Sequence, residues 1–237
     1  MVGAQNSDGG FPCKGREGNP SCLNDTCFWI GKMISQGAKE MEGPLHRACE
    51  WVLSTQSSEG AFVEPIRLRS VPNLPPWVAP GKPTPNMPQL VAYLLEAGYG
   101  ERVETRRAIA HLLGYWRNVD GSFRPGYMVW CLIEVLRKMG LPEDSVQVGE
   151  AVKATRSYID SEARKDASAL LWCLNSLRSA GFGKDSELVG EVSGFLLALR
   201  RDDGGWAYED GEGRIQKQSD PALTEKVLHA LRSYGLV

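Results

Sequence analysis

The chain has 237 residues, 42% of them hydrophobic and 24% charged, which is ordinary for a soluble globular protein and allows one domain or two small ones. The 27 Lys and Arg against 29 Asp and Glu give a net charge of -2, and because no dense basic run stands out, we expect no nucleic-acid partner. Six scattered cysteines are too few for a disulfide scaffold, and no apolar run reaches the ~20 residues of a membrane span, so we expect a soluble cytoplasmic protein without a transmembrane segment.

A short motif recurs four times along the chain. It reads QNSDGGF at 5–11, QSSEGAF at 56–62, RNVDGSF at 117–123 and RRDDGGW at 200–206. The last interval is the longest, and we expect a degenerate copy without the glycines near residues 158–160. Self-similarity of this kind indicates a repeat architecture, here of about five units.

Between the motifs, apolar residues recur at helical spacing, and no segment is a good candidate for a β-strand. We expect helices, in chain order, at residues 24–36, 44–55, 86–97, 103–116, 127–139, 146–159, 167–180, 187–199 and 221–234. Alternate helices share one ending, seen in LVAYLLEAG, LIEVLRKMG, CLNSLRSAG and VLHALRSYG, whose final glycine is a typical helix stop. The sequence therefore predicts an all-α fold of helical hairpins, each closed by the acidic glycine–aromatic motif.

The motif has a structural explanation. Glycine permits positive φ where the chain reverses, the acidic and Gln or Arg side chains can satisfy backbone groups at helix ends, and the aromatic residue can cover the joint. Asp166 and Asp220 precede expected helices, as N-cap residues commonly do. We therefore assign these residues to the fold and look for function elsewhere.

The segment 57–88 interrupts the helical pattern. It cannot form a regular helix because it contains a series of prolines, namely Pro65, Pro72, Pro75, Pro76, Pro80, Pro83, Pro85 and Pro88. A loop of this length inside a compact domain is typically a lid, a binding loop or a partner contact, and a rigid strap is an equally good alternative. We expect a single domain over residues 1–237 with a Pro-rich loop or lid at about 63–88.

The QxxDGGF/W repeats between paired helices resemble those of terpenoid cyclases and protein prenyltransferase β subunits, over essentially the whole chain. The resemblance implies an α/α toroid, in which inner helices line an apolar cavity and outer helices surround them. The inner helices would be the glycine-ended set at 24–36, 86–97, 127–139, 167–180 and 221–234. Five inner and four outer helices are fewer than the family's closed ring has, so we expect a ring that is open, small, or completed by a partner subunit or a second copy of the chain.

The stretch GREGNPSCLNDTCFWIG at 15–31 is similar to the zinc-binding stretch of protein prenyltransferases. The matching residues are Asp25, Thr26, Cys27, Phe28, Trp29 and Gly31, with two residues missing between the cysteine and the Phe-Trp pair. The resemblance implies that Asp25 and Cys27 are catalytic residues that bind zinc, a metal that suits a carboxylate and a thiolate.

Alternatives to this zinc pair stay open. The family completes its site with a histidine where this chain has Pro88 and Gln89, so His46 or Cys22 would have to substitute. A second metal option is a cluster of four cysteines, Cys13, Cys22, Cys27 and Cys49. The spacing of these cysteines matches no close-paired ligand pattern. Cys27 also suits a small core residue, because free cysteine is among the most buried residue types.

The usual cyclase motifs are missing from the chain. In the family, an Asp-x-Asp-Asp motif supplies the acid for protonation, and this chain has none. The Asp-Asp-x-x-Asp diphosphate motif of ionising synthases is absent as well. The sequence therefore supports neither standard cyclase chemistry.

Six side chains on the proposed inner helices would line the cavity: Trp29, Tyr93, Tyr127, Trp130, Trp172 and His229. Aromatic walls suit isoprenoid chains and can stabilise cationic centres, although the same stripe is also typical of an ordinary core. Three hypotheses follow. The first is an enzyme that acts on an isoprenoid or similar apolar substrate, as a zinc-dependent prenyl transferase or a non-standard cyclase. The second is a non-catalytic toroid that binds a lipid or peptide. The third is a scaffold completed by a partner chain.

Overall fold

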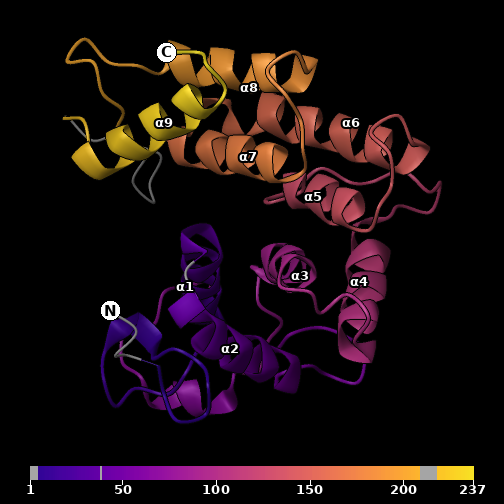
Figure 1. The fold of residues 1–237 in the computed structure, drawn as a ribbon, viewed down its shortest axis with the longest axis vertical. Coiled ribbons are helices and arrows are strands. Elements are labelled where there is room, and N and C mark those ends of the chain that lie inside the picture. The colour runs from indigo at the N-terminus through magenta and orange to yellow at the C-terminus, as the bar shows by residue number, and fades with distance from the viewer. Residues whose placement is uncertain (1–4, 38, 209–217) are drawn as a thin grey trace. The chain divides into compact units, whose positions relative to one another are not determined.

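The computed structural model describes residues 5–37, 39–208 and 218–237, and within them it contains nine α-helices and no β-strand (Figure 1). The helices are α1 (Leu23–Gln36), α2 (Glu42–Ser54), α3 (Met87–Glu96), α4 (Val103–Trp116), α5 (Trp130–Lys138), α6 (Val146–Ser161), α7 (Ala167–Ser179), α8 (Glu187–Ala198) and α9 (Pro221–Ser233). The all-α prediction is therefore confirmed. No described helix has the length and apolar character needed to cross a bilayer.

The predicted helices differ from the observed ones only at their ends. The largest difference is at α5, which begins at Trp130 rather than at residue 127. Its start is delayed because Met128 adopts a left-handed conformation, with φ of 64°. The glycines predicted to stop alternate helices, Gly98, Gly140, Gly181 and Gly235, all have positive φ, as a left-handed helix terminus requires.

The chain divides into two compact units, Met1–Arg117 and Asn118–Val237, and each is described by itself. In the first unit α2 packs on α1, α4 packs on α3, and α1 contacts α3. In the second unit α6 packs on α5, α8 packs on α7, and α7 contacts both α5 and α9. Within each unit, odd-numbered helices therefore contact one another and each even-numbered helix packs on the one before it. The single domain over residues 1–237 and the five-repeat ring stay predictions.

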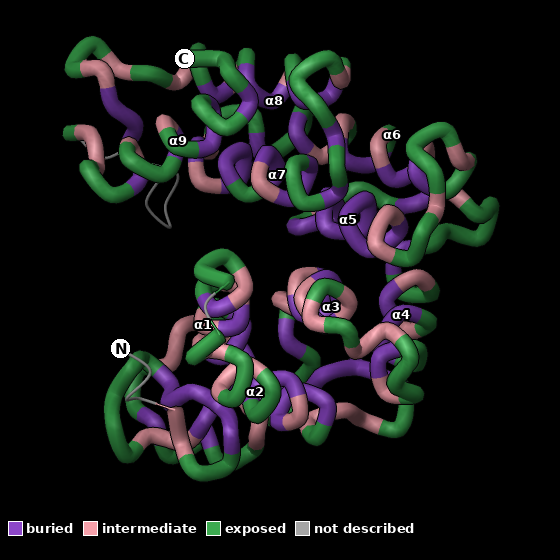
Figure 2. The backbone as a smooth tube through the Cα atoms, in the orientation of Figure 1, coloured by how far each residue is buried: buried purple, intermediate pink, exposed green. Residues whose placement is uncertain are grey.

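Helix burial follows the same alternation in the second unit. Every residue of α5 from Trp130 to Leu136 is buried, and Figure 2 shows this helix in purple along most of its length. A helix that is apolar on all sides must be enclosed by other elements. The neighbouring α6 instead buries a single stripe, Val148, Ala151, Ala154, Thr155 and Ile159. The sequence of α5 thus specifies a helix enclosed by its neighbours, and that of α6 a helix buried along one face.

Each copy of the motif forms a turn around a glycine with positive φ: 93° at Gly9, 96° at Gly60, and 85° at Gly121 and Gly204. The acidic side chain then accepts a hydrogen bond from the backbone N–H two residues later in three copies. These bonds run from Gly10 to Asp8 (3.0 Å), from Ser122 to Asp120 (3.0 Å) and from Gly205 to Asp203 (3.1 Å). Glycine and acid therefore act together to close the turn.

The glutamine of the motif connects its turn to an even-numbered helix, α2 or α4. The Gln56 amide donates to the carbonyl of Gly60 (3.0 Å) and to that of Glu104 in the first turn of α4 (2.7 Å). Gln5 likewise donates to the carbonyls of Gly9 (2.7 Å) and Pro44 (2.9 Å), at the start of α2. These bonds give the motif the structural role expected from its sequence.

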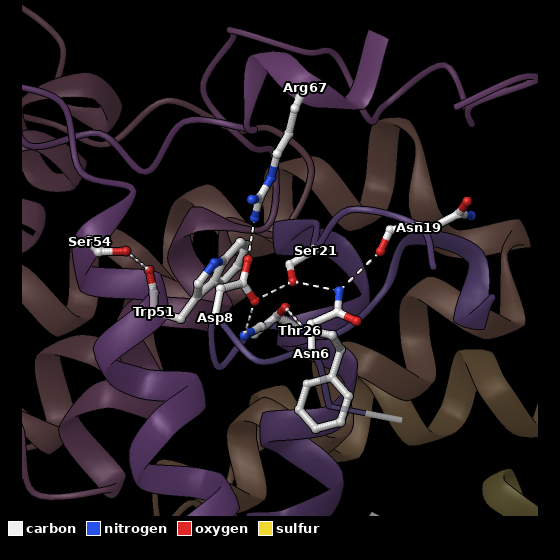
Figure 3. A network of polar contacts seen from close by, with 10 residues as sticks. Asn6, Asp8, Asn19, Ser21, Thr26, Trp51, Ser54 and Arg67 are labelled. Carbon is white, nitrogen blue, oxygen red and sulfur yellow. Dashed lines mark hydrogen bonds and ion pairs between the residues drawn. The ribbon is translucent and has the colours of Figure 1, made fainter. Parts of the chain in front are cut away.

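The first and last motifs share further contacts with the inner helix that follows them. Ser21 Oγ donates to Asp8 (2.7 Å), as Ser219 Oγ does to Asp203 (2.6 Å). Figure 3 shows Asp8 between Ser21 and Arg67. Asp8 forms an ion pair with Arg67. The N–H groups of the two motif aromatics donate to threonine hydroxyls, Phe11 to Thr26 (2.9 Å) and Trp206 to Thr224 (3.0 Å).

The degenerate copy predicted at residues 158–160 is not a turn. These residues lie in the last turns of α6, which continues to Ser161 because the segment contains no glycine to stop it. The joint to α7 is made instead by the short 3₁₀ helix Ala163–Lys165 and by Asp166. The position predicted for this copy was therefore wrong.

Asp166 and Asp220 are N-cap residues, as predicted. Asp166 accepts hydrogen bonds from the backbone N–H groups of Ser168 (2.8 Å) and Ala169 (3.2 Å), and Asp220 accepts one from Leu223 (2.7 Å). Both carboxylates therefore satisfy N–H groups that a helix start leaves without an intrahelical partner.

We expect Asp166→Ala to lower the free energy of unfolding by about 1 kcal/mol, because α7 loses the acceptor for two backbone N–H groups. Urea unfolding followed by circular dichroism measures the change. The exposed Asp185 gives a matched control, and Asp185→Ala should change the stability by less than about 0.5 kcal/mol. Equal losses in the two variants would argue against the capping role.

The Pro-rich segment is packed against the rest of the first unit. Its two ends meet where Glu64 N–H donates to the carbonyl of Lys82 (2.9 Å) and Gly81 N–H donates to that of Glu64 (2.8 Å). Between them, Leu68, Val71, Leu74 and Val78 form a small core with Cys13 and Cys22. These contacts are those of a strap, the alternative to a lid that the sequence left open.

Candidate functional site

Three of the predicted substrate-binding residues come together in the second unit. Tyr127, just before α5, lies with its ring centroid 6.0 Å from that of Trp130 on α5 and 6.3 Å from that of Trp172 on α7. Tyr158 of α6 extends the group, 5.8 Å from Trp130. We call Tyr127, Trp130, Tyr158 and Trp172 the aromatic cluster.

The aromatic cluster has a buried base and an exposed edge. Trp130 is fully buried, and no described residue accepts a hydrogen bond from its indole N–H. The side chains around the base of the cluster therefore offer an apolar environment. Tyr127 is 48% exposed and Trp172 is 43% exposed. Burial, aided by the negative charge of Asp166, raises the pKa of Tyr127 to about 12, so its hydroxyl stays neutral. Tyr127 and Trp172 therefore place two large neutral rings at the surface of the second unit.

The remaining predicted substrate-binding residues lie elsewhere. In the first unit, Trp29 stacks on Phe11 with centroids 5.3 Å apart, and the Lys32 ammonium lies 4.8 Å from the Trp29 ring. Tyr93 of α3 packs against Gly31 of α1, where a Cβ atom would overlap its hydroxyl. His229 is exposed on α9 and makes no ring contact among the described residues.

A hollow of ≈ 260 Å³ lies between α6 and α8 in the second unit. It is lined by Arg156, Ile159, Asp160, Glu191 and Phe195. Arg156 forms ion pairs there with Glu191 (2.9 Å) and with the nearby Glu187 (2.6 Å). This mixed charged and apolar lining contains none of the predicted substrate-binding residues.

Asp25, the predicted metal ligand, lies beside two buried cysteines. The ligand atoms of Cys13, Cys22 and Asp25 are all within 4.8 Å of one another. Cys22 is the N-cap residue of α1, and its thiol donates to Asp25 Oδ2 (2.9 Å). We call Cys13, Cys22 and Asp25 the cysteine–aspartate group. The described residues form no other group of three or more His, Cys, Asp or Glu that could hold a metal ion.

A closed loop brings the two cysteines together. Cys13 N–H donates to the carbonyl of Pro20 (2.9 Å), and the Asn19 amide donates to the carbonyl of Cys13 (2.7 Å). Pro12 and Ser21 pair as an isolated antiparallel β-bridge. Cys13 directly follows Pro12 and Cys22 directly follows Ser21, so the bridge holds the two cysteines near each other. Lys14 has a left-handed φ of 62°, and its N–H donates to Asp25 Oδ2 (3.3 Å). The loop thus folds back onto the first turn of α1.

Burial keeps both thiols of this group protonated. It raises the pKa of Cys13 and of Cys22, and the nearby Asp25 carboxylate raises both further because it disfavours a second negative charge. Burial likewise raises the pKa of Glu64 to about 6, against hydrogen bonds from the N–H groups of Leu23 and Asn24 that lower it. Four groups that can become negatively charged therefore lie at the start of α1, where helix N–H groups favour anions.

The zinc set implied by the prenyltransferase resemblance does not fit this arrangement. Cys27 is buried on α1 and is not a member of the cysteine–aspartate group, since side chains two positions apart on a helix do not face each other. Pro88 is buried in the first turn of α3, and His46 bonds to the Tyr99 hydroxyl through Nδ1 (2.5 Å). The third ligand of the family therefore has no equivalent beside Asp25.

The four-cysteine alternative was wrong, since the group contains Cys13 and Cys22 but neither Cys27 nor Cys49. All six cysteines are buried, and none of them forms a disulfide. The burial of Cys27 agrees with the alternative that it is a small core residue. Cys22 is an N-cap residue and Asp25 lies three residues after it, in the first turn of the helix. This spacing is the signal in the sequence that could have identified the pair.

Comparison with known proteins bears on the fold alone. No family model matches the chain, and no curated protein matches it closely. Its structure is similar to the crystal structure of a protein from Actinoplanes, with a TM-score of 0.59 and 17% sequence identity, over 98% of this chain and 80% of that one. At this identity, the likeness shows a shared fold and leaves function to the residues of the site.

Proposed function

We propose that the protein binds an apolar, isoprenoid-like small molecule through the aromatic cluster of Tyr127, Trp130, Tyr158 and Trp172. The observation that carries this proposal is the contact between the half-exposed rings of Tyr127 and Trp172 over a buried Trp130. Adjacent exposed aromatic rings on an apolar base are favourable contacts for hydrocarbon chains, because they bury large area with few rotatable bonds.

The proposed scaffold is an α/α toroid of about five repeats. The contacts among odd-numbered helices and the all-round burial of α5 support an inner layer, and the positions of α2, α4, α6 and α8 support an outer one. The similarity to the Actinoplanes protein covers 98% of this chain, so it extends over both units. A partner subunit or a second copy of the chain would complete a ring of this size.

The binding form of the hypothesis is favoured over the transferase and cyclase forms. Asp25 lies beside Cys22 and Cys13 rather than in the prenyltransferase ligand set, so the donor set gives no support to prenyl transfer. Asp203, the acid of the last motif, accepts hydrogen bonds from Gly205 and Ser219 and is engaged in closing its turn. The acid beside the aromatic cluster, Asp166, is engaged as the N-cap of α7, where it accepts two backbone hydrogen bonds.

The test is farnesol binding measured by isothermal titration calorimetry. We expect Trp172→Ala to weaken binding about tenfold, equivalent to ~1.4 kcal/mol, because the ligand loses one of the two exposed rings. Trp77 is 58% exposed and lies in the first unit, so Trp77→Ala is a matched control that should bind as the unaltered protein does. No farnesol binding by the unaltered protein, or equal binding by Trp172→Ala, would refute the proposal.

A further inference from the structure

We infer that the cysteine–aspartate group, together with Glu64, binds one divalent metal ion, with zinc as the best match. Cys13 and Cys22 would supply two sulfur ligands, and Asp25 and Glu64 one oxygen ligand each. All four residues belong to the first unit, so this site does not rest on the aromatic cluster or on isoprenoid binding.

The three atoms of the group are already close to the spacing that a metal ion requires. They lie within 4.8 Å of one another. At zinc bond lengths of about 2.3 Å to sulfur and about 2.0 Å to oxygen, the ligands of a tetrahedral ion are roughly 3.5 Å apart. Side-chain movements of this size need no rearrangement of the loop that closes on α1.

Glu64 provides an independent observation next to the group, although its carboxylate is not among the ligand atoms that lie within 4.8 Å of one another. Its side chain is 1% exposed, and its Oε2 accepts a hydrogen bond from the N–H of Leu23 (2.9 Å), the residue that follows Cys22. Its second oxygen, Oε1, is buried and makes no hydrogen bond of normal length and angle among the described residues, while the nearby Thr84 hydroxyl lowers the pKa of the carboxyl. A buried carboxylate oxygen without a partner is unfavourable, and a cation held by the neighbouring thiolates and Asp25 would supply one.

The surroundings indicate a structural ion rather than a catalytic one. Both cysteines belong to the small core that includes Leu68, Val71 and Val78 of the Pro-rich segment. Four protein ligands would leave no coordination position open for a substrate, as in structural zinc sites. The ion would connect three segments of the first unit: the loop at 12–21, the start of α1 and the Pro-rich strap.

The donor set also selects the type of ion. Two thiolates favour zinc and similar soft cations over magnesium or calcium, which prefer oxygen ligands. Each thiol must lose its proton on binding, so one bound ion releases two thiol protons to the buffer. A divalent ion then offsets two of the four negative charges that the two thiolates and two carboxylates carry.

Cobalt(II) is the probe for the test, because cobalt–thiolate bonds give charge-transfer absorption in the near ultraviolet. The full chain is reduced, treated with chelator and titrated with cobalt and then with zinc. We expect one cobalt ion to bind per chain with thiolate absorption, and zinc to displace it. A reduced protein that binds neither metal, or that is purified under reducing conditions as a metal-free Cys13–Cys22 disulfide, would overturn the inference.

Variants separate this site from adventitious thiol binding. Cys22→Ser keeps an N-cap acceptor for α1 while removing a sulfur ligand, and it should lower metal affinity at least tenfold. Glu64→Gln keeps an acceptor for the N–H of Leu23 and should weaken binding while the thiolate absorption at saturation persists. Cys49→Ala removes another fully buried cysteine of the first unit and should leave the titration unchanged. Equal cobalt binding by Cys22→Ser and Cys49→Ala would refute the assignment.

Discussion

We expect Trp206→Ala to lower the free energy of unfolding by about 3–5 kcal/mol, because a fully buried tryptophan leaves a large cavity when it is truncated. Trp206 is 1% exposed. Its indole N–H donates to the carbonyl of Leu196 in the last turn of α8 (2.6 Å), and its backbone N–H donates to Thr224 on α9 (3.0 Å). This one residue of the last motif therefore bonds to α8 through its side chain and to α9 through its backbone.

Urea unfolding followed by circular dichroism measures this loss. Trp172→Ala is the matched control, because that tryptophan is half-exposed and its removal should change the stability by less than about 1 kcal/mol. Trp206→Phe keeps most of the buried volume and should cost only about 1–2 kcal/mol, chiefly through the lost hydrogen bond. If Trp206→Ala and Trp172→Ala were equally stable, the aromatic residue of the motif would not hold the joint between helices.

The helices were predictable because their signals are local. Apolar residues recur along each of them with the period of a helix, and glycine marks where α3, α5, α7 and α9 must end. The same reasoning misplaced the degenerate copy near residues 158–160, because it relied on an expected interval rather than on a glycine in the sequence. The helix ends that were predicted from a glycine present in the sequence were confirmed.

The cysteine–aspartate group was harder to predict because its members come together through a closed loop. Cys13 reaches Cys22 only when the Pro12–Ser21 bridge and the Asn19 amide fold the intervening residues. Glu64 reaches the same place through the turn of the Pro-rich strap. Neither arrangement has a period in the sequence, so the prediction placed the metal ligands by resemblance, at Asp25 and Cys27.

One signal in the sequence would have corrected that placement. Ser21 and Thr26 stand at the start of α1 as Ser219 and Thr224 stand at the start of α9, and both pairs bond to the preceding motif. Aligning SCLNDT with SDPALT places Cys22 opposite the N-cap Asp220. The alignment identifies Cys22 as the residue at the positive, N-terminal end of the helix dipole, and Cys27 as more than one turn further into the helix.

We expect Gly60→Ala to lower the free energy of unfolding by about 3 kcal/mol or more, because two independent penalties act at this position. The first is conformational, since Gly60 has φ of 96°, which a residue with a Cβ atom rarely adopts. The second is steric, since an added Cβ atom would lie 2.6 Å from the backbone carbonyl oxygen of Arg107. That oxygen belongs to α4, whose backbone cannot yield without disturbing the helix.

Two other glycines of the first unit separate these penalties in the same unfolding experiment. Gly98 has φ of 85° with no atom within 4 Å of an added Cβ, so Gly98→Ala should show the conformational penalty alone, about 1 kcal/mol. Gly114 lies within α4 in open space, and Gly114→Ala should raise the stability by up to about 1 kcal/mol. A Cβ atom added at Gly9 of the first motif would likewise lie 2.6 Å from the carbonyl oxygen of Arg47 on α2. If Gly60→Ala were no worse than Gly98→Ala, the motif glycine would be required for its backbone conformation only, and the close approach of each turn to the next outer helix would not contribute to the repeat.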